Sequence, residues 1–234
     1  MIPAVAHLNT DHIGKFIVVE GNVGVGKSTF CTQLTEQRSG EGKAHVQLFP
    51  EPVDKPAFRT LLGLYYEDPA RWGFTFQMYA LKERFKQHTL AAELVANGID
   101  AVQDRSIYAD GCFGRLVSLA GNMTKEEWDI YAESFGMLKR FLRYPDVMVY
   151  LRASPETCHE RTKARGREEE SGVPLDYLKE LHNEHEELVE AMSRFTRVVV
   201  FDWDEFPDDM TEINNQINTV LNEDVRFLKD FARL

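Results

Sequence analysis

The sequence predicts an α/β protein in which five short parallel strands alternate with helices. Two observations predict this fold class. Short, largely apolar segments of five or six residues recur along the 234-residue chain, and amphipathic segments of helical periodicity separate them. Because strands joined through helices run parallel, the runs are expected to form one doubly wound sheet flanked by helices. Residues 1–14 are expected to be a flexible leader, and residues 15–234 a single domain.

Each predicted strand contains valine, isoleucine or phenylalanine, as the strands of a buried parallel sheet do. The first ends in a glycine-rich loop, the second at Pro50-Glu51-Pro52 and the third at Asp104-Arg105-Ser106. These polar segments would meet at the carboxyl ends of the strands, where α/β proteins bind their ligands. In chain order the strands are expected at residues 15–20, 44–49, 99–103, 146–151 and 197–201.

Signals at their ends mark the predicted helices. Asp68-Pro69 indicates a break between two helices, and Asn97-Gly98 is typical of a helix C-terminus. Thr124 opens a capping box, and Ser154-Pro155 is typical of a helix start. The expected helices cover residues 28–38, 58–65, 72–97, 124–144, 154–167 and 174–195, with a further helix starting after Asp104-Arg105-Ser106 and polar helix after the last strand.

The composition disfavours several classes of protein. A net charge of −11 argues against binding to DNA or RNA, because that binding depends on basic surface. No apolar run approaches the length of a membrane span. Cys31, Cys112 and Cys158 show no paired spacing, so we expect reduced thiols in a cytoplasmic protein. His182 and His185 are expected on a solvated or core-flanking helix face and not as metal ligands.

The glycine-rich loop after the first strand has the pattern G-x4-G-K-S between a predicted strand and a predicted helix. Its backbone N–H groups would cradle the phosphates of ATP, with Lys27 on the β- and γ-oxygens and Ser28 on Mg²⁺. No NKxD-like tetrapeptide and no long acidic Walker B run is found, which favours a small-molecule kinase over a GTPase or a motor. The candidate ATP-binding residues here are Gly21, Asn22, Val23, Gly24, Val25, Gly26, Lys27, Ser28 and Thr29.

Two acidic residues follow the next two strands. Glu51, stiffened by its flanking prolines, is placed to accept the proton of an attacking hydroxyl; the alternative is a solvated turn residue. Asp104 is placed to hold Mg²⁺, directly or through water, and Arg105 to bridge the transferred phosphate and the base. Both strand ends would face the phosphate loop.

A group of arginines surrounds Gly166 between two predicted helices. Arg161, Arg165 and Arg167 are expected to form a lid, at about residues 161–173, that folds over the triphosphate. The alternative is a solvated basic helix end. The acidic run that ends at Glu170 is equally open: it is a solvated turn, or one acid binds a sugar hydroxyl.

Six motifs occur in an order that identifies a family. They are GNVGVGKST, PEPV, YEDPARWGFTFQMYAL, DRSIYAD, EEWDIY and RGREEESGVPLDYLKELHNEHE. Over residues 16–203 the chain resembles the deoxynucleoside kinases, which include deoxycytidine, deoxyguanosine and bacterial deoxyadenosine kinases. The resemblance implies a P-loop kinase fold, ATP and Mg²⁺ as donor and cofactor, a deoxynucleoside acceptor and a homodimer formed through the long helices.

The resemblance also implies a role for each matching residue. Glu51 looks like the base for the 5′-hydroxyl, with Arg105 beside it, and Lys27 completes the catalytic set. The lid arginines belong to the donor site, and Asp104 replaces a metal-binding glutamate of the animal enzymes. The implied substrate-binding residues are Glu51, Tyr66, Gln77, Arg84, Arg105, Asp110, Phe113 and Glu170.

The base pocket is expected along one helix face. Gln77 and Arg84 are two helical turns apart, so both face one pocket, where the Gln77 amide would pair with a base edge. A charged pair of Arg84 and Asp110 favours deoxycytidine or a purine deoxynucleoside over thymidine, without choosing among the three. Where the family usually has phenylalanine this chain has Gly114, and Phe113 is expected to replace it.

Two rival functions stay open at this point. A nucleoside monophosphate kinase of the thymidylate type shares the phosphate loop, a Glu-Pro turn and an Asp-Arg motif, but it needs a further arginine for the acceptor phosphate. A non-enzymatic nucleotide-binding subunit would not need Glu51, Asp104 or the lid arginines.

Overall fold

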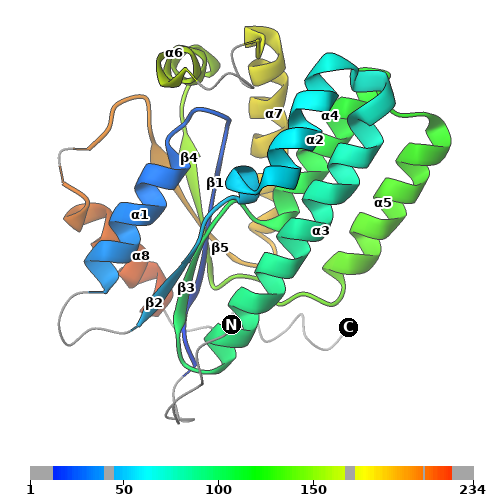
Figure 1. The fold of residues 1–234 in the computed structure, drawn as a ribbon. Coiled ribbons are helices and arrows are strands. Elements are labelled where there is room, and N and C mark those ends of the chain that lie inside the picture. Colours follow the sequence, from blue (N-terminus) through cyan, green and yellow to red (C-terminus); the bar gives the residue numbers. More distant parts are fainter. Residues whose placement is uncertain (1–12, 40–44, 167–171, 208, 223–234) are drawn as a thin grey trace.

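Five parallel strands form one sheet at the centre of the computed structural model, which describes residues 13–39, 45–166, 172–207 and 209–222 (Figure 1). The strand order is β2-β3-β1-β4-β5, so the strand that leads into the phosphate loop is central. All five predicted strands are confirmed to within two residues. They are β1 (Phe16–Gly21), β2 (Val46–Phe49), β3 (Asp100–Asp104), β4 (Val147–Arg152) and β5 (Arg197–Asp202).

Helices cover both faces of this sheet. Helices α1 and α8 lie on one side, and α2, α3, α4, α5 and α7 lie on the other (Figure 1). The helical elements are α1 (Lys27–Arg38), η1 (Pro52–Asp54), α2 (Pro56–Glu67), α3 (Pro69–Ala96), η2 (Ile107–Ala109), α4 (Asp110–Leu119), α5 (Lys125–Lys139), α6 (Pro155–Arg165), α7 (Leu175–Met192) and α8 (Thr211–Asn222).

The alternation of side chains along β1 explains the two cores. Ile17 and Val19 pack in the cluster that contains α1 and α8, whereas Phe16 and Val18 pack against α3, α5 and α7. All four side chains are fully buried. Burial on both sides therefore fixes β1, and with it the loop that follows.

Most helix ends follow the predicted signals, but α5 ends earlier than expected. The capping box at Thr124 is present, and Ser154 caps α6. The prediction that α5 reaches residue 144 is wrong, since the helix stops at Lys139. The next three backbone N–H groups, up to Leu142, bond to carbonyls three residues back, which tightens and ends the helix. Pro145 then disfavours helical backbone in the residue before it.

Two further structural findings concern the cysteines and the helices. The three cysteines are free and buried. Within the ranges that the structure describes, no helix combines the length and apolarity that crossing a membrane would require.

Candidate active site

The phosphate loop joins β1 to α1 and curls around the Lys27 ammonium group. Lys27 Nζ donates hydrogen bonds to the carbonyls of Gly21, at 3.2 Å, and Asn22, at 2.9 Å. Burial and the nearby Arg105 guanidinium lower the pKa of Lys27 to about 8. A buried ammonium group in this position attracts phosphate oxygens strongly, because a bound anion compensates the burial of its charge.

Contacts with α6 and α7 fix the shape of this loop. Gly24 has φ +82°, and a Cβ atom there would lie 2.2 Å from Thr162 Oγ1, so no side chain fits. Asn22 Nδ2 donates to the Leu178 carbonyl at 2.8 Å, and Val25 is buried in the core. Gly21, Asn22 and Val25 therefore shape the loop, whereas the cavity is lined by Val23, Gly24, Gly26, Lys27, Ser28 and Thr29.

Ser28 and Asp104 form a pair that suits a magnesium ion. Ser28 Oγ donates to Asp104 Oδ2 at 2.6 Å. Asp104 is 1% exposed, and its Oδ1 atom has no hydrogen-bond partner among the described residues. Burial, together with the neighbouring Glu51 carboxylate, raises the pKa of Asp104. A hydroxyl and a buried carboxylate with an unused oxygen fit Mg²⁺, which takes only one or two protein carboxylates and otherwise binds phosphates and water.

Glu51 follows β2 and is clamped by two arginines. Its Oε1 atom accepts from Arg84 Nη2 at 2.7 Å and from Arg105 Nε at 2.9 Å. Burial would raise the pKa of Glu51, but the two guanidinium groups outweigh it and hold the pKa well below its usual value. Glu51 is therefore a carboxylate across the working pH range. Its hydrogen bonds to two arginines, and not its charge, distinguish it from a freely solvated turn residue.

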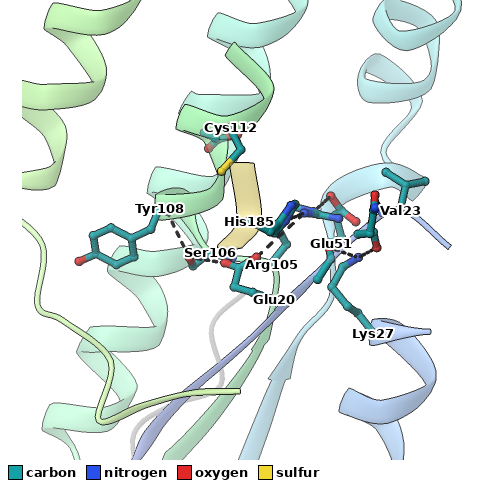
Figure 2. Close-up of polar contacts among 12 residues, drawn as sticks. Glu20, Val23, Lys27, Glu51, Arg105, Ser106, Tyr108, Cys112 and His185 are labelled. Carbon is teal, nitrogen blue, oxygen red and sulfur yellow. Dashed lines mark hydrogen bonds and ion pairs between the residues drawn. The ribbon is translucent and has the colours of Figure 1, made fainter. Parts of the chain in front are cut away.

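Besides Glu51, Arg105 has two buried neighbours that the sequence did not reveal as part of the site, Glu20 and His185. Figure 2 shows Glu20, Glu51 and His185 gathered around it. Glu20 is fully buried and accepts from the Ser106 backbone N–H at 2.7 Å, while its other oxygen lies 4.0 Å from Arg105 Nη1. Arg105 has φ +63°, a left-handed backbone that is uncommon outside glycine.

Two sequence signals would have found these neighbours. Glu20 is an acidic residue that ends an otherwise apolar strand. His185 shares a helical stripe with Leu178, Leu181 and Leu188, and it is fully buried. Of the two environments expected for His185, the structure excludes the solvated face, because the side chain is buried in the protein. Its neighbour His182 is the more exposed of the two, with 23% of its side chain exposed.

A cavity of about 480 Å³ connects the phosphate loop with the predicted acceptor residues. Its wall includes Tyr66, Gln77, Arg84 and Phe113, with Glu51 and Arg105 near the phosphate loop. Gln77 is 3% exposed, and its Oε1 atom has no hydrogen-bond partner in the described part of the chain. The apolar remainder of the wall was not singled out from the sequence as part of the site: Val53, Phe58, Leu62, Tyr65, Phe76, Ala80, Ala164, Val173, Tyr177 and Phe206.

Asp110 lies deeper than the sequence suggested. It is fully buried and contacts Arg84 Nη1, and Arg84 rather than Asp110 lines the cavity. Burial raises the pKa of Asp110 to about 6, against the opposing effect of Arg84. Asp110 therefore binds the Arg84 guanidinium from the protein interior, while Arg84 itself faces the cavity.

The missing phenylalanine at position 114 has a packing explanation. A Cβ atom on Gly114 would lie 2.2 Å from Tyr131 Cε1, so the α5 tyrosine occupies that space. Phe113 instead reaches the cavity wall, with the guanidinium carbon of Arg105 4.7 Å from its ring centre. Phe113 therefore lines the cavity, and its stacking on a base stays a prediction.

The predicted lid is only partly described. Arg161 donates to the carbonyls of Val25, Trp203 and Asp204 at 3.1, 2.8 and 2.8 Å, and its guanidinium lies 4.0 Å from the ring centre of Phe206. Arg161 and Arg165 line the cavity. Arg167 and Glu170 lie outside the described residues.

Comparison with known proteins gives one consistent family. A sequence profile described as deoxynucleoside kinase matches residues 17–226. The chain is 33% identical to a deoxyadenosine kinase of Dictyostelium discoideum, over 83% of this chain and 75% of the relative. It is 34% identical to the deoxycytidine kinase of Mus musculus, over 74% of each chain. Human mitochondrial thymidine kinase 2 is 33% identical, over 86% of this chain and 75% of the relative.

Proposed function

The chain belongs to the deoxynucleoside kinase family, and from this we propose that it transfers the γ-phosphoryl group of ATP to the 5′-hydroxyl of a deoxynucleoside. One observation carries the proposal. The Glu51 carboxylate and the Lys27 ammonium group line the same cavity, so a hydroxyl held by Glu51 would face the phosphates held by the loop.

In the proposed mechanism, the protein mainly positions groups and stabilises charge. Glu51 accepts the proton of the 5′-hydroxyl as the new bond to phosphorus forms, and Arg105 keeps the carboxylate aimed at the hydroxyl. Lys27 and the lid arginines stabilise the charge on the moving phosphoryl group. Mg²⁺, held by Ser28 and Asp104, would neutralise the phosphate oxygens of ATP.

We propose that the acceptor is deoxyadenosine, deoxyguanosine or deoxycytidine in preference to thymidine. Gln77 and Arg84 offer polar groups to the base, and Glu51 and Asp110 fix Arg84 in the cavity wall. Tyr66 and Glu170 are proposed to bind the 3′-hydroxyl, and Phe113 to stack on the base. A thymidine kinase among the relatives leaves the choice of base to experiment.

Two further proposals concern the assembly and location. We propose a homodimer formed through the long helices, because α5 and the turn after it present exposed Ile130, Met137 and Phe141. Sedimentation at micromolar concentration would distinguish a dimer from a monomer. The free, buried cysteines support a cytoplasmic location.

Competition between acceptors tests the substrate directly. Purified protein with ATP and Mg²⁺ is offered all four deoxynucleosides together, and then the corresponding monophosphates. We expect phosphorylation of deoxynucleosides that contain an exocyclic amino group. Preferred phosphorylation of monophosphates would favour the thymidylate kinase type of reaction, and thymidine as the best acceptor would overturn the proposed base preference.

The Glu51→Gln variant tests the proposed base. The amide cannot accept the proton, so we expect kcat to fall by about 10²- to 10⁴-fold. Binding of the nucleoside, followed by tryptophan fluorescence, should change little because Gln77 and Arg84 are intact. Glu36→Gln, on the exposed face of α1, is the matched control and should behave as wild type. Near-normal turnover of Glu51→Gln would exclude Glu51 as the base.

A further inference from the structure

His185 lies inside the protein against the catalytic arginine. It is fully buried on α7, stacked on Tyr150 with ring centres 6.3 Å apart and edge-on to Phe113 at 6.2 Å. Its Nδ1 atom is 2.7 Å from the Leu181 carbonyl oxygen, and its Nε2 atom is 3.3 Å from Arg105 Nη1 (Figure 2). Both ring nitrogens are therefore engaged.

These two partners determine the tautomer of His185. A carbonyl oxygen only accepts and a guanidinium only donates, so Nδ1 carries the proton and Nε2 offers its lone pair. Burial and the positive charge of Arg105 lower the pKa of His185 to about 3, which keeps the ring neutral. A buried neutral acceptor beside an arginine does not neutralise charge but fixes orientation.

Arg105 needs such an acceptor because its guanidinium must keep one orientation to donate to Glu51. One edge of the guanidinium donates through Nε to Glu51 at 2.9 Å, and Nη1 points to His185. Glu20 is too distant, at 4.0 Å, to fix Nη1 by itself. Without His185, the Arg105 side chain could rotate about its last torsions and leave Glu51.

We propose that His185 is a positioning residue for phosphoryl transfer, whose Nε2 atom holds the Arg105 guanidinium in the orientation that aims Glu51. This inference rests on the proposed role of Glu51 in the reaction. Because His185 acts through Arg105 and lines no part of the cavity described above, its loss should affect turnover more than binding.

Two substitutions at position 185 separate positioning from packing. His185→Leu removes the acceptor, and we expect kcat to fall by about 10- to 100-fold with the KM for the nucleoside changed less than threefold. His185→Gln keeps an acceptor at a similar reach and should retain kcat within about threefold of wild type. His182→Leu, one turn earlier on α7, is the matched control and should leave kcat unchanged. Equal losses in the Leu and Gln variants, or none in either, would overturn the proposal.

Two further measurements test the same proposal, and the first needs no variant. Long-range ¹H–¹⁵N spectra of the wild-type protein should show His185 protonated on Nδ1 alone, and a proton on Nε2 would contradict the proposal. In an Arg105→Lys background, His185→Leu should reduce kcat by less than threefold further, because the two residues act together; a full additional loss would refute the coupling. If wild-type protein phosphorylates no deoxynucleoside, the proposed function fails while the spectra still report on the tautomer.

Discussion

At the scale of single residues, Gln77 stands apart because it is buried without full hydrogen bonding. Its Oε1 atom lacks a partner in the described part of the chain, and such groups lower stability by about 1–3 kcal/mol. The same amide lines the cavity, where a base edge would supply the missing donor. The proposed recognition of a base would thus explain why a destabilising polar group is kept at this position.

Gln77→Leu should consequently change binding and stability in opposite directions. We expect the Kd for the preferred deoxynucleoside to rise about 10- to 100-fold, from the loss of about 1–3 kcal/mol of base recognition. Tm without ligand should stay equal or rise, because an unsatisfied polar atom is removed. Calorimetric titration and thermal unfolding measure the two effects. Met78→Leu, a volume-conserving change next in sequence, should alter neither; unchanged binding in Gln77→Leu would exclude base recognition by Gln77.

Which site residues could be predicted depended on how local their environment is. The phosphate loop and Glu51 are defined by neighbours in sequence, and the structure brings both to one cavity. Arg161 is tied to carbonyls near residues 25 and 203, which no local pattern reveals. The deep burial of Asp110 and the inward side chain of His185 also depend on helices distant in sequence.

At the scale of elements, the packing of α4 on α5 decides which α4 side chain reaches the cavity. The Tyr131 ring fills the space beside Gly114, and its hydroxyl donates to the Asp110 carbonyl at 2.7 Å. Gly111 similarly faces Phe135, whose ring a Cβ atom would approach to 2.9 Å. Two glycines on α4 thus admit two aromatic rings of α5.

Gly114→Ala should disrupt this contact. We expect a loss of about 1–3 kcal/mol in the free energy of unfolding, because the added methyl group overpacks the Tyr131 ring. Urea denaturation measures it, and Tyr131→Leu in the same background should recover part of the loss. Gly136→Ala, within α5 and facing open space, is the control and should stabilise by about 0.5–1 kcal/mol. Equal effects at both glycines would contradict the role of Tyr131.

Element ends were predictable where the signal lies within a few residues. The Thr124 capping box and the Ser154 cap are local and appear as expected. The end of α5 could not be predicted in this way. The helical periodicity of the sequence continues past Lys139, although the next backbone N–H groups bond to carbonyls three residues back instead of four. Helix propensity alone does not register that change.

At the scale of the whole molecule, Arg38 joins parts that are distant in sequence. From the end of α1 it donates to Asn214 and Asn218 of α8, at 3.2 and 2.6 Å, and to Asp100 of β3 at 3.0 Å. The side chains of Arg38 and Asp100 are only 10% and 6% exposed. Arg38 therefore links the C-terminal end of α1 to α8 and to the start of the interior strand β3.

Arg38→Leu should weaken the entire fold. Removing Arg38 leaves the buried Asp100 carboxylate without its ion-pair partner. We therefore expect the free energy of unfolding to fall by about 3–5 kcal/mol. The matched control is Arg59→Leu, whose pair with Asp54 is exposed and should contribute about 0–1 kcal/mol. Urea unfolding of both variants gives the comparison. Similar small changes would show that α8 is held by its apolar face alone.

The sequence predicts five parallel strands but not their order in the sheet. Apolar content does not follow position in the sheet: the interior strand β3 reads Asp-Ala-Val-Gln-Asp, whereas the edge strand β5 reads Arg-Val-Val-Val-Phe-Asp. The order emerges from the pairing of β1 with β3 on one side and β4 on the other.

The central place of β1 has a consequence for synthesis of the protein on the ribosome. Residues 16–21 leave the ribosome long before residues 100–104 and 147–152, which enclose β1 from both sides. Until about two thirds of the chain has been translated, the strand that carries the phosphate loop keeps an unpaired apolar edge. The part of the enzyme that handles ATP is thus translated early and completed late, and a nascent chain that stalls before β4 presents that edge to other proteins.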